Sequence, residues 1–206
     1  MNIYSINNGV LNYCPPQHFK LEKQMQQLIE NNLPAISELE LVKSEFRIKN
    51  ERIDTLAFNK KRKAFVIIEY KRDRNYSVID QGISYLKLML ENKADCLMKY
   101  NEKYGRTVPL SKGDVIWSNC YIIFAAPDFT ERQVNAACYK DLKIILWLIS
   151  LYGDSVLTIN EIKNGQRQSP PLHVENESGN KVTKPPQGWF NEPLWDKIKI
   201  IGKQVD

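Results

Sequence analysis

The segment AFVIIEYK, residues 64–71, constrains the fold of this chain more than any other part of its sequence. Its β-branched and aromatic residues predict a strand, and the run is too apolar for a strand at the protein surface. Glu69 and Lys71, two positions apart, project from the same face of that strand. A buried strand with a charged end requires a chemical role or a partner for those charges.

A second predicted strand, residues 51–58, precedes this one, and the KKRK turn at 60–63 joins the two. If the strands pair antiparallel with Phe58 opposite Phe65, directly opposed residues share a face of the sheet. One face then brings Asp54 opposite Glu69 and Arg52 opposite Lys71. The other face forms apolar core from the pairs Ala57–Val66, Thr55–Ile68 and Ile53–Tyr70. This register therefore gives one apolar face that can be buried and one face on which two carboxylates lie together.

Carboxylates about 5 Å apart repel each other unless a cation neutralises them. A divalent cation bound by Asp54, Glu69 and the backbone carbonyl of Tyr70 would do so. Lys71 could then orient or deprotonate an attacking water, and these two roles stay open. The alternative is a surface salt-bridge cluster of the same three charged side chains, because a D-x₁₄-E-x-K spacing alone is a weak pattern.

The histidine and cysteine content limits which side chains could bind a metal or catalyse hydrolysis. The 206 residues include only two histidines, His18 and His173, and the four cysteines form no CxxC pair. Histidine-based hydrolases and cysteine zinc sites are therefore disfavoured. Carboxylate oxygens remain as ligands, and they suit Mg²⁺ or Mn²⁺.

Positive charge is concentrated around these strands. Residues 43–74 carry eleven Lys or Arg against five acids, whereas the whole chain has a net charge of +5. This distribution favours a polyanionic partner such as DNA. The candidate contacts are Arg52, Lys60, Lys61, Arg62, Lys63, Arg72 and Arg74. A solvated hairpin tip explains the KKRK run equally well.

The remaining pattern predicts a strand over 41–48 before the two described above. It also predicts helices over 17–33, ending before Pro34, and over 78–91, capped by Ser77 with Asp80. The second helix would bury Ile79, Ile83, Leu86 and Leu90. A short helix and loop should occupy 92–114, followed by a strand within 115–127, a helix over 131–141 with a Thr130–Gln133 capping box, and strands near 143–149 and 155–162. This α-β-β-β-α-β-α-β order predicts an α/β fold with a mixed central sheet flanked by helices. We expect one domain over 1–163 and an arm with an apolar tail over 164–206.

The stretch SEFRIKNERIDTLAFNKKRKAFVIIEYKRDRNYSVIDQGISYLKLM resembles the PD-(D/E)xK nuclease superfamily. It is most similar to RecB-like and NucS-like members, which carry a RIDxLA strand, an IEYK strand and a following QxxxY helix. LEKQMQQLIENN resembles their first helix, and its glutamate corresponds to Glu22. The Pro-Asp dipeptide of the superfamily name is Ile53-Asp54 here. The similarity is strong over residues 20–90.

The resemblance implies a restriction-endonuclease-like αβββαβ core, Mg²⁺ or Mn²⁺, and hydrolysis of DNA phosphodiester bonds in restriction, repair or defence. Asp54 and Glu69 would bind metal, and Lys71 would be the catalytic lysine. Gln81 and Tyr85 would position lysine or DNA, and Glu22 or Glu45 would assist the metal.

Two alternatives are a catalytically silent nucleic-acid-binding protein and a protein-interaction module. The 164–206 tail could bind a protein partner or mediate homodimerisation. The N-terminus MNIYSINNGV lacks the features of a signal peptide, and no apolar run is long enough to span a bilayer. We therefore expect a cytoplasmic protein with no membrane contact.

Overall fold

The computed structural model describes residues 2–73, 78–106, 109–138, 142–153 and 155–162. The chain divides into two units, Met1–Pro171 and Leu172–Asp206, and the second unit lies outside the described residues, as does the predicted arm and tail over 164–206. The helices are α1 Glu22–Ile36, α2 Val78–Glu91, α3 Lys93–Tyr104 and α4 Glu131–Ala137, with short 3₁₀ turns at Lys112–Asp114 and Trp117–Asn119. The strands are β1 Ile3–Asn7, β2 Val10–Cys14, β3 Pro16–Gln17, β4 Leu39–Ile48, β5 Glu51–Asn59, β6 Ala64–Tyr70, β7 Tyr121–Ala126, β8 Ile144–Tyr152 and β9 Val156–Glu161.

The predicted mixed central sheet is confirmed. Its strands follow the order β3-β8-β7-β6-β5-β4, and β9 also pairs with β8. β6 pairs parallel with β7, and β7 pairs parallel with β8, whereas β4, β5 and β6 form an antiparallel meander. β6 is thus a central strand, as its apolar sequence predicts. β1 and β2 form a separate two-stranded sheet.

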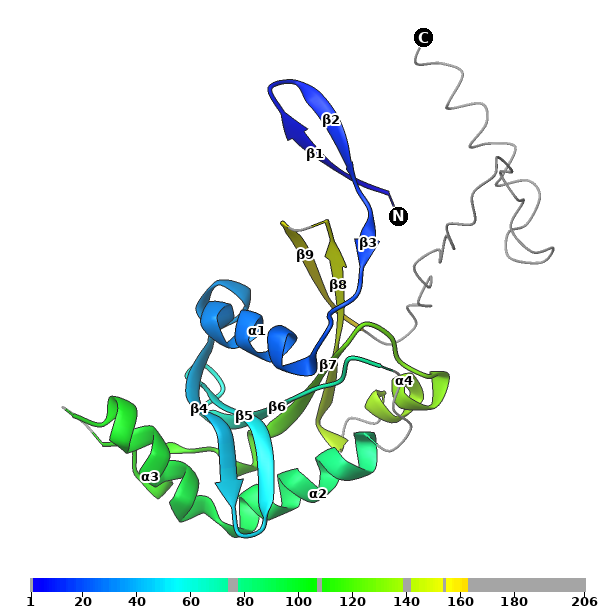
Figure 1. Cartoon of the computed structure of the whole chain (residues 1–206). Helices are drawn as coiled ribbons and strands as arrows, with labels where there is room; N and C mark the ends of the chain where they lie inside the picture. Colours follow the sequence, from blue (N-terminus) through cyan, green and yellow to red (C-terminus); the bar gives the residue numbers. More distant parts are fainter. Residues whose placement is uncertain (1, 74–77, 107–108, 139–141, 154, 163–206) are drawn as a thin grey trace. The chain divides into compact units, whose positions relative to one another are not determined.

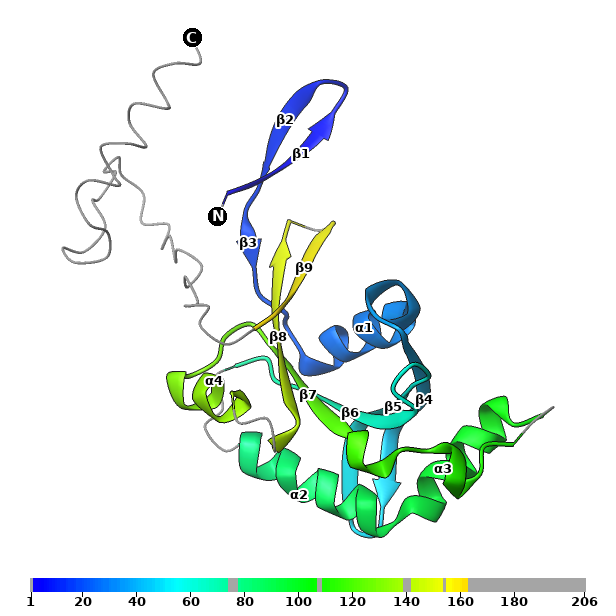
Figure 2. The same ribbon diagram turned by 180° about the vertical axis from the view of Figure 1, so that it is seen from behind.

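Helices cover both faces of the sheet, with α1 on one side and α2 on the other (Figures 1 and 2). Alternate residues of β6 point into two separate cores. The α1 core takes Met25, Ile29 and Leu33 of the helix together with Val66, Ile68 and Tyr70 of the strand. The α2 core takes Tyr85 and Met89 together with Phe65, Ile67 and Phe124. The period of two along β6 therefore divides its residues between the cores, and it places Glu69 on the α2 side.

The first helix differs from its predicted bounds at both ends. It begins at Glu22 rather than at 17, because Pro16 and Gln17 pair with β8 and Leu21 is extended. It also continues through Pro34 to Ile36. The Ser37 amide still donates to the Leu33 carbonyl at 2.9 Å, so the proline removes one helical hydrogen bond without ending the helix. The strand predicted over 64–71 ends at Tyr70.

The second helix has the predicted bounds, and three residues of its predicted buried stripe, Ile79, Leu86 and Leu90, are partly buried against the core. The prediction of Ile83 is wrong, because this side chain is 39% exposed, and in the part of the helix whose side chains are described Tyr85 and Met89 are the buried ones. Gly82 shares their face, and a Cβ built there would lie 2.2 Å from the ring of Phe124. The glycine lets α2 approach β7 closely, which rotates the buried stripe toward Tyr85. The predicted cap residue Ser77 lies outside the described residues.

The Thr130–Gln133 capping box is confirmed, with the Gln133 amide 3.2 Å from Thr130 Oγ1 and the Thr130 amide 2.7 Å from Gln133 Oε1. The helix it starts ends at Ala137, earlier than predicted. In the described ranges, no helix has the length and hydropathy needed to cross a membrane.

Candidate active site at the end of the β5–β6 hairpin

The predicted strand register is confirmed from Asn59–Ala64 to Thr55–Ile68, where the ladder ends. Asp54 and Glu69 lie just beyond its last pair. There the side chains replace the missing ladder bonds: the Asp54 amide donates to Glu69 Oε1 at 3.1 Å, and the Tyr70 amide donates to Asp54 Oδ2 at 3.2 Å. The two carboxylates therefore meet as predicted, but each also binds the backbone of the opposite strand.

Burial makes this carboxylate pair costly to ionise. Glu69 is only 2% exposed. Burial first, and the charge of Asp54 second, raise the pKa of Glu69 to about 8. Burial also raises the pKa of Asp54, and the charges of Glu45 and Glu22 add to that rise. A cation between the two acids would remove the mutual repulsion and favour both ionised forms.

Lys71 lies immediately after β6, next to this pair. Its amide donates to the Ala125 carbonyl of β7 at 3.0 Å, which fixes its backbone to the parallel neighbour strand. Its charge lowers the pKa of both Asp54 and Glu69, opposing the effect of burial. Lys71 therefore lies close enough to act electrostatically on both carboxylates, and its catalytic role stays a prediction.

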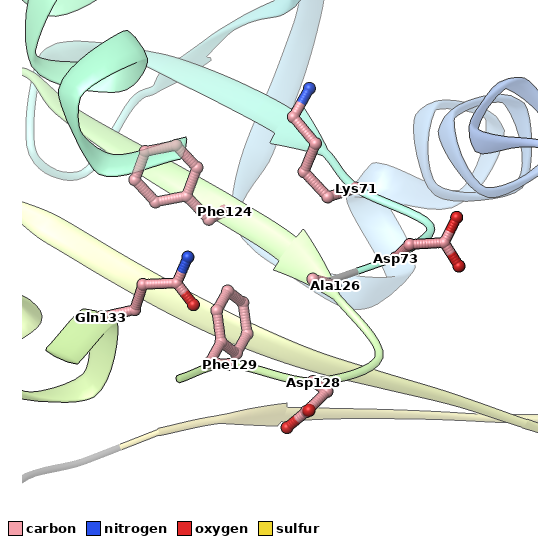
Figure 3. A pocket seen from close by; sticks show the side chains of 7 residues that line it. All are labelled: Lys71, Asp73, Phe124, Ala126, Asp128, Phe129 and Gln133. Atoms are coloured by element: carbon pink, nitrogen blue, oxygen red, sulfur yellow. The ribbon is translucent and has the colours of Figure 1, made fainter. Parts of the chain in front are cut away.

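A small pocket lies beside Lys71, between the ends of β6 and β7 and the start of α4 (Figure 3). Its lining residues are Lys71, Asp73, Phe124, Ala126, Asp128, Phe129 and Gln133. The amino group of Lys71 extends away from Phe129 and Gln133 in this view. The lysine head is therefore turned out of the apolar part of the pocket.

Gln81 and Tyr85 approach the site from α2, as their i, i+4 spacing predicts. Gln81 Nε2 donates to the Tyr85 hydroxyl at 2.9 Å. Burial raises the pKa of Tyr85, and the charges of Glu69 and Asp54 contribute to that rise. The hydroxyl therefore stays protonated on the side of the sheet where the two carboxylates lie.

Glu22 and Arg72 meet on the other side of the cluster. Glu22 Oε1 accepts a hydrogen bond from the Arg72 amide at 3.1 Å. The Arg72 guanidinium donates to the Lys20 carbonyl at 2.9 Å and pairs with Asp73 at 2.6 Å. These contacts fix the segment after β6 against the start of α1. Arg74 lies outside the described residues.

Glu45 is engaged by two cations. Lys23 Nζ lies 2.6 Å from Glu45 Oε1, and Arg52 Nε lies 3.0 Å from Glu45 Oε2. The hydrogen bond from Lys23 is the main cause of a lowered Glu45 pKa. The backbone of Glu45 has a φ of 52°, which is uncommon for a residue other than glycine. The Glu45 carboxylate is therefore engaged in ion pairs with α1 and with the neighbouring strand β5.

The KKRK turn lies at the opposite end of the β5–β6 hairpin from the carboxylates. Lys60 pairs with Glu40 at 2.6 Å, and Lys61 pairs with Glu38 at 3.7 Å. The Arg62 guanidinium lies 5.0 Å from the centre of the Tyr121 ring. The structure thus does not bring these cations together with Asp54 and Glu69, and their predicted contact with DNA stays a prediction.

Sequence reasoning missed a buried polar network on the α1 side, formed by Gln26, Glu30 and Thr55, which are at most 8% exposed. Gln26 and Glu30 follow Glu22 at successive intervals of four, so the three share one row of the helix. Polar residues repeating beside the buried Met25 and Ile29 were the available signal.

No group of three or more His, Cys, Asp or Glu side chains is arranged to hold a metal within the described ranges. The candidate ligands are therefore the two carboxylates of Asp54 and Glu69, with a backbone carbonyl. All of these donors are oxygen atoms, which fits Mg²⁺ or Mn²⁺.

No family model matches this chain. It is similar to an uncharacterized protein of Haemophilus influenzae, with 48% identity over 178 residues. The match covers 86% of this chain and 58% of that relative, so the chain spans less than three fifths of the relative's length.

Three solved structures overlap with part of the fold. A repair endonuclease from Pyrococcus abyssi has a TM-score of 0.40 at 21% identity, covering 62% of this chain and 47% of that one. EndoMS in complex with double-stranded DNA has a TM-score of 0.42 at 19% identity, covering 62% and 46%. Pyrococcus furiosus SfsA with Ca²⁺ has a TM-score of 0.31 at 16% identity, covering 69% and 74%. Overlaps of this extent assign no function, which rests instead on the chemistry of the site.

Proposed function

We propose that this protein is a metal-dependent nuclease of the PD-(D/E)xK type that hydrolyses DNA phosphodiester bonds. The observation that carries the proposal is the pair of buried Glu69 and half-buried Asp54, whose pKa values are raised and whose neighbour is Lys71. Two neighbouring acids that repel each other, one of them fully buried, destabilise a fold unless a ligand neutralises them. A divalent cation is the ligand that this pair fits.

Asp54, Glu69 and the backbone carbonyl of Tyr70 would hold the metal. When bound, Mg²⁺ or Mn²⁺ would offset negative charge developing on the phosphate and lower the pKa of an attacking water. Lys71 acts on that water, either by orienting it or by taking its proton. The Gln81–Tyr85 pair, linked at 2.9 Å, positions the lysine or the DNA from the α2 side.

Two glutamates were candidates to assist the metal, and Glu22 is the better placed. Two cations already neutralise Glu45, whereas Glu22 accepts a hydrogen bond from the neutral amide of Arg72. The side chains of Arg52, Arg72 and Arg74 would contact DNA phosphates, which bind cationic side chains regardless of sequence.

The wider roles are proposals of the same kind. The reaction would serve restriction, repair or defence in the cytoplasm. The 164–206 tail would bind a protein partner or a second copy, as cutting both strands of a duplex favours. The alternatives are a silent DNA-binding protein and an interaction module.

A metal titration separates these functions. We expect purified protein to cleave supercoiled plasmid or circular single-stranded DNA with Mg²⁺ or Mn²⁺ and to leave both intact in EDTA. Asp54→Ala, purified identically, is the control for a contaminating nuclease and should be inactive at every metal concentration. DNA binding without cleavage would favour the silent binding protein, and equal cleavage by Asp54→Ala would exclude this site.

The KKRK turn gives a prediction that depends on the length of the DNA. Five residues separate Asp54 from Asn59, which corresponds to roughly 17 Å of strand. That distance spans about five base pairs of duplex. Replacing Lys60, Lys61, Arg62 and Lys63 with glutamine should therefore weaken binding to a long duplex, similarly for unrelated sequences, and should flatten its dependence on log salt.

Fluorescence anisotropy across a salt series measures this effect. A duplex that extends only two or three base pairs from the cut site is the control, and its affinity should change little. An unchanged salt slope on the long duplex would show that the turn faces solvent away from the DNA.

A further inference from the structure

The far side of the proposed metal site is held by α1 through a primary amide. Gln26 is only 3% exposed, and its Nε2 donates to the Asp54 carbonyl at 2.8 Å and to Glu30 Oε1 at 2.9 Å. Its Oε1 accepts a hydrogen bond from Lys23 Nζ at 3.2 Å. The amide therefore uses both its donors and its acceptor, and one of these bonds fixes the main chain of a proposed metal ligand.

Glu30 continues the connection to the neighbouring strand. It is 8% exposed and accepts a hydrogen bond from Thr55 Oγ1, which lies 3.3 Å from the Tyr70 hydroxyl. A hydroxyl carries one proton, so Thr55 donates to the carboxylate and accepts from Tyr70. The phenolic hydroxyl of Tyr70 carries its own proton and supplies it as the donor in this contact. Glu30 is thus linked to the residue whose carbonyl would face the metal.

These contacts lie where β5 and β6 stop pairing with each other, although β6 still pairs with β7 and β5 still pairs with β4. The β5–β6 ladder ends at Thr55–Ile68, one residue before Asp54 and Glu69. Beyond it, the strands are joined by the two carboxylate-to-amide bonds at 3.1 and 3.2 Å. The same carboxylates are the proposed metal ligands, so when they turn to a cation, the contacts from α1 still connect Asp54 and Thr55 of β5 with Tyr70 of β6.

We propose that Gln26 and Glu30 are positioning residues that preorganise the metal site from the opposite face of the sheet. Gln26 holds the main chain of Asp54, and Glu30 holds Tyr70 through Thr55. Neither side chain is proposed to bind the metal, because the Gln26 amide is engaged by the Asp54 carbonyl and Glu30, and the Glu30 carboxylate is engaged by Gln26 and Thr55. This inference rests on the proposed function and adds residues that its metal-binding set does not contain.

The test measures metal binding by the full chain, without turnover. Gln26→Met keeps the length of the side chain and removes its donors, and Gln27→Met is the matched control on the exposed side of the same helix. Titration of Mn²⁺ by electron paramagnetic resonance, with Asp54→Ala as the blank, gives the affinity. We expect Gln26→Met to weaken Mn²⁺ binding by about 10-fold or more, as loss of a group that orients metal ligands does. Gln27→Met should match wild type.

A second pair of variants covers the case in which Gln26→Met does not fold. Thr55→Val preserves shape and removes the hydroxyl, whereas Thr55→Ser keeps it. Thr55→Val should lose Mn²⁺ affinity and Thr55→Ser should retain it. Wild-type affinity in Gln26→Met, or equal affinity in the two Thr55 variants, would overturn the inference. If wild type binds no more Mn²⁺ than the Asp54→Ala blank, the proposed function itself fails, and the inference fails with it.

Discussion

Lys71→Ala is expected to lose most DNA cleavage, by about 100-fold or more in a single turnover, while DNA affinity stays within a few-fold of wild type. Positioned groups that act on a proton in the transition state have effects of this size. Lys71 follows Glu69 by two residues, and its backbone is fixed to β7 through the Ala125 carbonyl at 3.0 Å. It is therefore held in place beside the carboxylates whose pKa values its charge lowers.

Measuring the single-turnover cleavage rate together with the equilibrium affinity for DNA separates an effect on the chemical step from an effect on DNA binding. Lys87→Ala is a matched control, because Lys87 is exposed on α2 and pairs with Glu91 at 3.9 Å. It should leave both quantities unchanged. If Lys71→Ala lowers binding and cleavage by the same factor, Lys71 is a phosphate clamp and its proposed action on the water is wrong. If Lys71 only formed a surface salt bridge, Lys71→Ala would lower the free energy of unfolding by under about 1 kcal/mol and would leave the cleavage rate unchanged.

Glu69→Gln is expected to abolish cleavage and, in EDTA, to stabilise the fold at alkaline pH. The pKa of Glu69 in the folded protein is raised from 4.5 to about 8. A raised folded pKa means that its contribution to stability is fully present below pH 4.5 and is lost as pH rises through about 8. Glutamine keeps the acceptor for the Asp54 amide and carries no charge, so it removes this loss.

Unfolding by denaturant at pH 4, 7 and 9 measures the effect. The variant and wild type should have similar free energies of unfolding at pH 4, and the variant should gain roughly 2–4 kcal/mol at pH 9 in EDTA. Mg²⁺ should reverse the order, because it stabilises only a protein that binds it. If the free energies of unfolding of the two proteins changed in parallel with pH, the pKa of Glu69 would not be raised in the folded protein.

Much of the hairpin was predictable because a strand has a side-chain period of two. Pairing Phe58 with Phe65 predicted the faces of both strands as far as Thr55–Ile68, where the ladder ends. The next predicted pair is wrong, because Ile53 packs in the α2 core and Tyr70 in the α1 core. The capping box at Thr130 was predictable for a similar reason, since it depends on residues three positions apart. Local patterns of this kind determine which side chains share a face.

Other parts depend on contacts between elements distant in sequence. The buried stripe of α2 is set by Gly82 lying against Phe124, a contact across more than forty residues. Gln26 and Glu30 appear in the sequence as polar interruptions of an apolar helix face. Only the packing of α1 on the sheet shows that Asp54 and Thr55 supply their partners. The end of the ladder before Asp54 likewise follows from side chains that bind the backbone of the opposite strand.

The contact between Asp54 and Glu69 and the backbone bond between Lys71 and Ala125 should form at different stages of folding. Asp54 and Glu69 belong to one hairpin with a short turn, so the chain closes only a small loop to bring them together. The backbone bond of Lys71 to Ala125 instead closes a loop of more than fifty residues. Contacts of low sequence separation generally form sooner. The acid pair should therefore form before the lysine is anchored, and a divalent cation should speed refolding as well as slow unfolding.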